Sequence, residues 1–365
     1  MAEFSRSIGG WNAFFVLLLS ITIYTHVLLV PVLLMKAGRD AWLALLIATA
    51  IMALWIWMFS VISKRVNGMS IPLWIQQRFG TGMRYLITVP VALCTFMMSA
   101  IAFKDTISWS TATYLQYTPP IMLVILLALV CYWACSLGVR NIAYVAGIIG
   151  PLVVFCGIFI MSANMPKKHY SMLLPILEHG IAPVWQAVWD VLGGLIQIFF
   201  ILLIQPYLAP KVKVNFIRLF IFNLVIMVIT MGPLTGAISA FGLQEAMSQR
   251  YPPFEQWRIV QIGKYIEHMD FLSIFQWLSG SFIRISLLSF FTMDLFMIQT
   301  LKRRRIFLAF LFLLLVIWLM LPVSDVAIFR LMTTYYSVLI FCILGGVTIC
   351  LFLLSLFQRR LEEQS

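Results

Sequence analysis

The chain has 365 residues, of which 62% are hydrophobic and only 10% are charged, and its formal net charge is +12. A soluble domain is about 25% charged, so the composition excludes an ordinary soluble enzyme and predicts a multi-pass membrane protein. The positive charge does not require nucleic acid as a partner, because cytoplasmic loops of membrane proteins are rich in Lys and Arg.

Ten segments are long and apolar enough to cross a bilayer, which takes about 20 residues. In chain order they are 11–34, 41–63, 82–113, 119–138, 141–163, 184–209, 215–241, 269–300, 305–323 and 328–357. The third and the eighth are long, so we expect them to tilt or to extend beyond the bilayer. With the amino terminus inside, fifteen of the 25 Lys and Arg residues lie on the inner side and eight on the outer side. This bias predicts that both termini are cytoplasmic.

The two halves of the chain echo each other. The first span runs from Trp11 to Pro31, and the sixth runs similarly from Trp185 to Pro206; four more spans follow each of them. An odd number of spans per half gives the halves opposite orientations, which is typical of inverted-repeat transporters with a site near the midplane. We therefore predict one membrane domain over 1–365, with repeats at about 11–163 and 184–357.

Polar residues within the spans are the candidate site, because polar groups in hydrocarbon are costly unless they are satisfied. They are Ser20, Thr22, Tyr24, Thr25 and His26 in the first span, Lys104 and Asp105 in the third, Gly193, Gly194 and Gln197 in the sixth, and Arg284 in the eighth. Glycine and proline favour a local helix break, where freed backbone groups can bind a carboxylate or an amine.

Plainer interpretations exist for several of these residues. His26 can be a neutral, hydrogen-bonded core histidine, and Lys104 can extend its amine to the membrane surface. Arg284 has apolar neighbours on both sides, which favours an interior role as a fixed cation or as an ion-pair anchor. The six cysteines lie in apolar runs and the four histidines have no metal-ligand spacing, so we expect no metal, no cofactor and no enzyme activity.

The longest polar stretch is 243–270, which we expect to be an outer loop over 243–268. It contains Pro252–Pro253 and then Ile259, Ile262 and Ile266 at helical spacing. This spacing predicts a short interfacial helix. The alternative is a plain connector, although the stretch is long for one.

Four stretches have a pattern that hydrophobicity alone does not dictate. They are Pro31 with AGRDAW (37–42), QPYLAPK (205–211), YPPFEQWRIVQIGKYIEHMD (251–270) and WLSGSFIRISL (277–287). In these stretches the chain resembles the B subunit of spore germinant receptors, the endospore germination permeases of the amino acid–polyamine–organocation (APC) transporter superfamily. The resemblance implies an all-α, LeuT-like fold of ten transmembrane helices in a 5+5 inverted repeat, with helices 1 and 6 discontinuous.

The resemblance also implies partners and a location. The partners are an A subunit, which is a membrane protein, and a C subunit, which is a lipoprotein; the location is the spore inner membrane. Relatives usually have a Gly-x-Gly break where this chain has Tyr24-Thr25-His26, and often a glutamate where it has Gln197. Arg284 retains a cation where relatives tend to have lysine.

The leading hypothesis is a subunit that senses a small nutrient, often an amino acid, bound near the midplane between helices 1, 3, 6 and 8. Side-chain contacts are expected from Thr22, Thr25, Ile101, Gln197 and Leu287, with Gly193 and Gly194 permitting a bend and Tyr24 and His26 either lining or filling the pocket. One alternative is a proton-coupled amino-acid transporter, in which His26 or Asp105 titrates. Another is a structural subunit whose ancestral pocket has closed.

Overall fold

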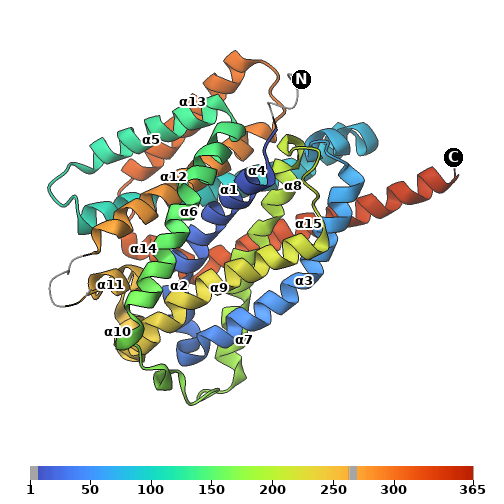
Figure 1. Ribbon diagram of the computed structural model, residues 1–365. Helices are drawn as coiled ribbons and strands as arrows, with labels where there is room; N and C mark the ends of the chain where they lie inside the picture. The colour runs from blue at the N-terminus through green and yellow to red at the C-terminus, as the bar shows by residue number, and fades with distance from the viewer. Residues whose placement is uncertain (1–6, 262, 264–268, 365) are drawn as a thin grey trace.

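The computed structural model describes residues 7–261, 263 and 269–364 (Figure 1). These residues form helices and connecting loops, and no β-strand occurs among them. In the first half the membrane helices are α1 (Gly10–Thr22), η2 (Ile23–Leu28) and α2 (Leu29–Ala37), which are continuous, then α3 (Ala41–Val66), α4 (Ile71–Thr113), α5 (Pro120–Leu137) and α6 (Val139–Ala163).

The second half begins after two short 3-10 turns, η4 (Met165–Lys167) and η5 (Tyr170–Leu173). Its helices are α7 (Ile181–Leu195), η6 (Ile196–Phe199), α8 (Phe200–Ile204) and η7 (Gln205–Tyr207), which are continuous, then α9 (Phe216–Phe241), α10 (Leu243–Ser248), α11 (Pro252–Arg258), α12 (Phe271–Asp294), α13 (Leu301–Met320), α14 (Asp325–Leu331), η8 (Met332–Tyr336) and α15 (Ser337–Gln364).

The described helices make ten passes. Eight stretches are long and apolar enough to span a membrane. The first of them, Gly10–Val66, makes two passes because the chain turns at Gly38, whose φ of 55° favours glycine. The remaining pass is α13, whose first turns carry the cationic residues Lys302 to Arg305.

The helix that contains the third pass begins earlier than the predicted span. Helix α4 starts at Ile71 rather than near residue 82, and it is interrupted at Gly80, where φ is 84°. The segment before Gly80 is polar at Gln76, Gln77 and Arg78 but buries Trp74 and Ile75. It is therefore a short amphipathic helix leading into the pass. The eighth pass, α12, ends at Asp294 and is shorter than expected.

The loop between the seventh and eighth passes contains two short helices, α10 and α11, and we call this end of the bundle the loop face. Helix α11 has Pro252 at its start, a favoured position for proline, and it buries Phe254 and Trp257 against the bundle. Of the expected helix around Ile259, Ile262 and Ile266, the last two residues lie outside the described part of the chain. The bounds of the loop and of the two repeats stay predictions.

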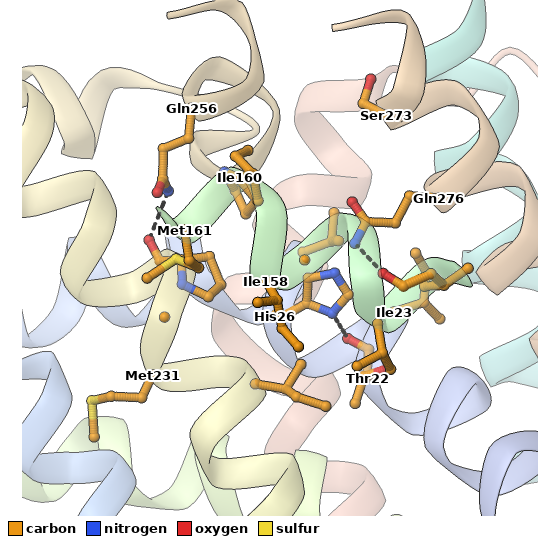
Figure 2. A pocket seen from close by; sticks show the side chains of 18 of the residues that line it. Thr22, Ile23, His26, Ile158, Ile160, Met161, Met231, Gln256, Ser273 and Gln276 are labelled. Atoms are coloured by element: carbon orange, nitrogen blue, oxygen red, sulfur yellow. Dashed lines mark hydrogen bonds between the residues drawn. The ribbon is translucent and has the colours of Figure 1, made fainter. Parts of the chain in front are cut away.

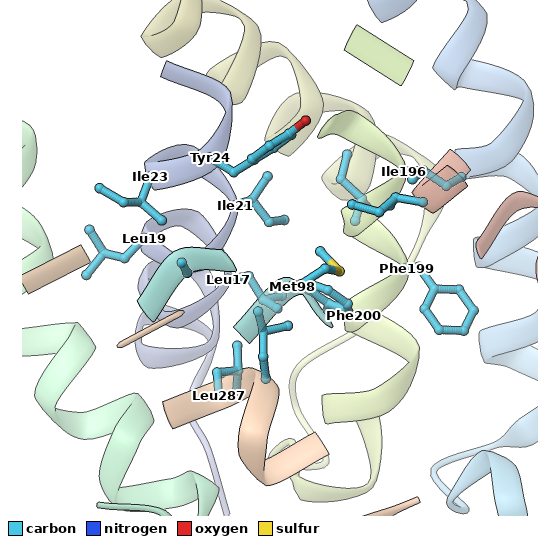
Figure 3. Packing of buried hydrophobic residues seen from close by; sticks show 14 of the residues in the cluster. Leu17, Leu19, Ile21, Ile23, Tyr24, Met98, Ile196, Phe199, Phe200 and Leu287 are labelled. Carbon is cyan, nitrogen blue, oxygen red and sulfur yellow. The ribbon is translucent and has the colours of Figure 1, made fainter. Parts of the chain in front are cut away.

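The first and sixth passes form the centre of the bundle. In Ile181–Tyr207, 94% of the most apolar window is buried, and side chains of α1, α4, η6, α8 and α12 meet there (Figure 3). Neither central pass contains an extended segment, and the discontinuity expected in each takes the form of a change of helix type. The first changes to a π-helix in η2, and the sixth changes to a 3-10 helix in η6. Such changes of helix type often mark functional sites.

Gly193 allows close approach of the sixth and tenth passes, because a Cβ there would collide with the backbone carbonyl of Ser337. We expect Gly193→Ala to lower the free energy of unfolding by about 1–3 kcal/mol, as overpacking does. Gly346→Ala is the matched control, because Gly346 has open space around it and alanine favours helix. Melting temperatures of the purified protein test this, and equal shifts in the two variants would contradict the observed contact.

Candidate functional site

The most polar group in the centre of the bundle is the guanidinium of Arg284 on α12, whose exposed fraction is 1%. Its Nη1 donates to Gln197 Oε1 on η6 at 2.8 Å and to the backbone carbonyl of Ser20 on α1. Its Cζ lies 5.5 Å from the centre of the Tyr24 ring, a cation–π distance. Three passes therefore converge on one cation.

The coordination of Arg284 is incomplete. Its Nε and Nη2 form no hydrogen bond of good geometry, although the Tyr336 hydroxyl lies beside the guanidinium. Among the described residues no carboxylate forms an ion pair with Arg284. A charge within a membrane is costly unless it is paired, and a guanidinium matches a carboxylate with two parallel hydrogen bonds. The arrangement is thus chemically suited to receive a carboxylate.

Tyr24 fills space between the first, sixth and tenth passes. Its hydroxyl lies 2.6 Å from Ser337 Oγ, and its ring meets that of Tyr336 edge-on with centres 5.4 Å apart. A Cβ on Gly194 would lie 3.4 Å from the Tyr24 ring. Tyr24 is therefore a packed side chain that occupies the position of the expected glycine break.

The neighbours of Tyr24 point in other directions. Thr25 faces the seventh pass, where its Oγ1 accepts a hydrogen bond from Thr230 Oγ1 at 2.9 Å. Thr22 Oγ1 donates to the carbonyl of Leu18 at 2.7 Å, and His26 Nδ1 lies 2.5 Å from the carbonyl of Thr22. Thr22 and His26 both line a cavity of about 550 Å³ (Figure 2), and Arg284 is not among its lining residues. The polar residues of the first span thus lie in three different environments. Tyr24 packs between the first, sixth and tenth passes, Thr25 bonds to the seventh pass, and Thr22 and His26 line the cavity.

The remaining predicted contacts are close-packed. Ile101 and Leu287 are buried in the apolar core, and Gly193 contacts the backbone of Ser337. Gln197 is the predicted contact residue that reaches Arg284, and its amide nitrogen donates to the carbonyl of Gly193 at 3.3 Å. The void that adjoins Arg284 measures about 10 Å³, which is about the space one water needs. The space beside Arg284 is therefore closed in this structure.

Asp105 belongs to a second group of side chains, nearer the loop face. Its Oδ1 accepts from Arg250 Nη2 at 3.0 Å and from Tyr251 Oη at 3.1 Å. Trp109 and Trp277 stack with ring centres 4.2 Å apart, and Tyr251 meets Trp277 edge-on. We call these five residues the outer cluster. Because Asp105 and Trp277 also line the void beside Arg284, the outer cluster separates Arg284 from the loop face.

The outer cluster is held by charge as well as by ring contacts. Burial raises the pKa of Tyr251, and the nearby Asp105 carboxylate raises it further, so the hydroxyl remains a proton donor. Arg250 also lies over the ring of Phe329 on α14, with its Cζ 4.2 Å from the ring centre. Lys104, by contrast, extends outward to the exposed Asp325 at 3.6 Å, so it does not join the cluster.

Several partners of the site were not anticipated. Arg250 pairs with Asp105, and Lys36 pairs with the buried Asp190 at 2.6 Å. Tyr336 and Ser337 lie in the tenth pass, where polar side chains within an apolar span are a signal that would have found them. Among the described residues, no three His, Cys, Asp or Glu side chains cluster as metal ligands would.

Comparisons of sequence identify the relatives of this chain. Residues 11–326 match the family described as spore germination protein. Spore germination protein XB of Bacillus anthracis is 37% identical over 314 residues, which cover 86% of this chain and 88% of that protein. Spore germination protein KB of Bacillus subtilis (strain 168) is 23% identical, over 69% of this chain and 68% of that protein.

Comparisons of structure confirm the LeuT-like fold. The crystal structure of MhsT in complex with L-phenylalanine has a TM-score of 0.65 at 13% identity, over 94% of this chain and 89% of that one. A Na⁺-coupled sialic acid symporter, in a substrate-bound outward-open state, has a TM-score of 0.59 at 14% identity, over 92% and 78% of the chains. Ten passes and an inverted repeat were therefore correctly predicted from the sequence.

Because Asp105 of α4 is buried in the outer cluster and Asp325 of α14 is exposed, we expect their substitution by asparagine to have unequal effects on stability. Asp105→Asn should destabilise the protein by about 1–3 kcal/mol, because it removes a charged acceptor from Arg250 at a buried position. Asp325→Asn should change stability by less than about 1 kcal/mol, because that ion pair is largely exposed. Thermal unfolding of the two purified variants measures the difference; a larger effect of Asp325→Asn would contradict the structure.

Proposed function

Because the chain belongs to the spore germination protein family, we propose that it is the nutrient-sensing subunit of a spore germination receptor. The observation that supports a sensing role is the incompletely paired guanidinium of Arg284 at the crossing of the first, sixth and eighth passes. The proposed ligand is an amino acid or another small carboxylate, bound near the midplane between helices 1, 3, 6 and 8.

An amino acid would complete the coordination of Arg284. Its carboxylate would take the two remaining donors, Nε and Nη2, while Nη1 keeps its bonds to Gln197 Oε1 and the Ser20 carbonyl. Each of these oxygens has a second lone pair, which suits the ligand's ammonium group. The solved transporter that holds L-phenylalanine shares this fold, which supports an amino acid as a ligand of suitable size. Tyr24, Ile101, Gly193, Gly194 and Leu287 remain the proposed surroundings of that site. Of the other predicted contact residues, Thr22 and His26 line the separate cavity beside η2, and Thr25 bonds to the seventh pass.

Sensing would follow from the closed state of the space beside Arg284. A void of about 10 Å³ cannot hold a nutrient, so binding requires a second conformation in which the outer cluster separates. A ligand that binds only that conformation shifts the population towards it. We propose that this shift is transmitted to an A subunit and a C subunit, in the spore inner membrane, with both termini of this chain cytoplasmic.

The closed space beside Arg284 also favours a second candidate function, which is a structural subunit whose ancestral pocket is permanently filled. In that case Tyr24 would act purely as packing, through its contacts with Ser337 and Tyr336. The two candidates differ in one measurable property, because only a sensing subunit binds nutrient.

The decisive variants change the charge and the shape of residue 284. Arg284→Met should weaken nutrient binding at least about 30-fold, the effect of losing one partner of a buried charge pair. Arg284→Lys should give an intermediate loss, because it keeps the charge but not the two-pronged geometry. The measurement is binding of a panel of radiolabelled amino acids to the purified receptor with its A and C subunits.

Arg218→Met is the matched control, because Arg218 is exposed on α9 and should leave affinity unchanged. Assembly of each variant with its partners must be verified by size-exclusion chromatography. Unchanged affinity in Arg284→Met would refute the proposed site.

If the unaltered receptor binds no nutrient although deletion of the chain abolishes germination, the structural candidate is favoured. Proton-driven uptake by the chain alone in proteoliposomes would instead favour a transporter.

A further inference from the structure

The cavity of about 550 Å³ beside η2 is a compartment distinct from the Arg284 site. It is enclosed by α1, η2, α6, α9, α11 and α12 (Figure 2), and its size is typical of small-molecule sites. Ile23, Val27 and Trp277 line both this cavity and the small void beside Arg284. One turn of η2 and the Trp277 side chain of α12 therefore form the wall between the two spaces. We call the larger space the lateral cavity.

The lateral cavity opens towards the membrane. Ile158 on α6 and Val228 on α9 line it, and 61% and 63% of their surfaces are exposed. Both residues lie within membrane-spanning helices, so this exposed surface faces hydrocarbon. Closer to the loop face the two helices touch, where a Cβ on Gly232 would lie 3.2 Å from Met161 Sδ. The opening is thus bounded within the thickness of the bilayer.

Access from the loop face is blocked by α11. Phe254 and Trp257 are buried beneath this helix and form the roof of the lateral cavity. The helix is fixed to its neighbours, because Asn164 Nδ2 donates to the Gln256 carbonyl at 2.7 Å and Gln256 Nε2 donates to the Pro233 carbonyl at 2.9 Å. A molecule that enters this space therefore comes from the bilayer.

His26 presents an available hydrogen-bond acceptor to the lateral cavity. Its Nδ1 lies 2.5 Å from the Thr22 carbonyl, which can only accept, so Nδ1 carries the proton. In the neutral imidazole the other nitrogen, Nε2, is then an acceptor, and Figure 2 shows the ring directed into the space. The amide of Gln276 is already engaged, since it donates to the Val153 carbonyl and accepts from Trp257 Nε1.

The lining also defines the charge of the occupant. No Asp, Glu, Lys or Arg is among the described residues that line the lateral cavity. The nearby Lys168 lies behind the lining, where its Nζ donates to the carbonyl oxygen and to Sδ of Met161 at 3.4 Å. The surface of the cavity therefore offers an ionic headgroup no charged partner. We propose that the lateral cavity binds an uncharged amphiphile that enters from the bilayer, with an apolar body among α6, α9 and α12 and one hydroxyl group that donates to His26 Nε2.

The test uses a photoactivatable long-chain alcohol, a hexadecanol with a diazirine in its chain, on the purified protein in nanodiscs. We expect crosslinks to concentrate on lining residues of α6 and α9, such as Ile158 and Met231, and unlabelled hexadecanol to compete. The corresponding methyl ether lacks the donor and should label these sites about fivefold less, the effect of one hydrogen bond. His26→Phe should abolish the difference between the alcohol and its ether.

Two glycine variants provide a matched pair. Gly157→Leu fills the lateral cavity, because a Cβ there meets only Gln276 Nε2 at 3.6 Å, whereas Gly346→Leu adds the same side chain beside open space on α15. Labelling should be lost in the first variant and retained in the second, with unchanged melting temperatures as the folding control. Uniform labelling of all lipid-facing helices, equal in both variants, would overturn the proposal.

The source of the occupant is a separate measurement. Native mass spectrometry of the protein extracted from membranes should reveal a bound hydroxyl-bearing lipid that is absent from Gly157→Leu. If no lipid copurifies but the alcohol labels as described, the natural occupant is a free amphiphile dissolved in the bilayer. Neither outcome depends on nutrient binding, so the result is independent of the Arg284 experiments.

Discussion

A guanidinium within a membrane must find acceptors, and this requirement organises the centre of the bundle. Arg284 takes a backbone carbonyl from α1, a side-chain oxygen from η6 and the face of an aromatic ring from η2. Each of these groups belongs to a central pass, so the position of one side chain relates the eighth pass to the first and the sixth. The surrounding apolar packing encloses the cation and leaves beside it a void of only about 10 Å³.

The same requirement recurs at the loop face with the charges reversed. Asp105 is a buried carboxylate on α4, and the loop between the seventh and eighth passes supplies its two donors, Arg250 and Tyr251. The stacked Trp109 and Trp277 then cover the interior between the two charged centres. Arg284 and Asp105 line opposite sides of one small void, so any route from the loop face to Arg284 passes the outer cluster.

Much of the fold follows from the sequence, because hydrophobic length and cation bias report directly on passes through a bilayer. Arg284 could also be identified, since a cation among apolar residues stands out. The directions of Tyr24, Thr25 and His26 could not, because a π-helix alters the angular spacing of successive side chains that an α-helical pattern assumes. The lateral cavity was equally inaccessible to sequence reasoning, since its walls come from five passes or loops distant along the chain.

The two-sided position of Ile23 and Val27 has a thermodynamic consequence. A partition one side chain thick cannot yield space to one compartment without taking it from the other, so occupancy of the two compartments is linked. Linkage of this kind is reciprocal: whatever dissolves in the bilayer and fills the outer space alters the affinity of the inner one, and the reverse. If the chain is the proposed sensor, its dose–response would then depend on the composition of the membrane around it as well as on the solution outside.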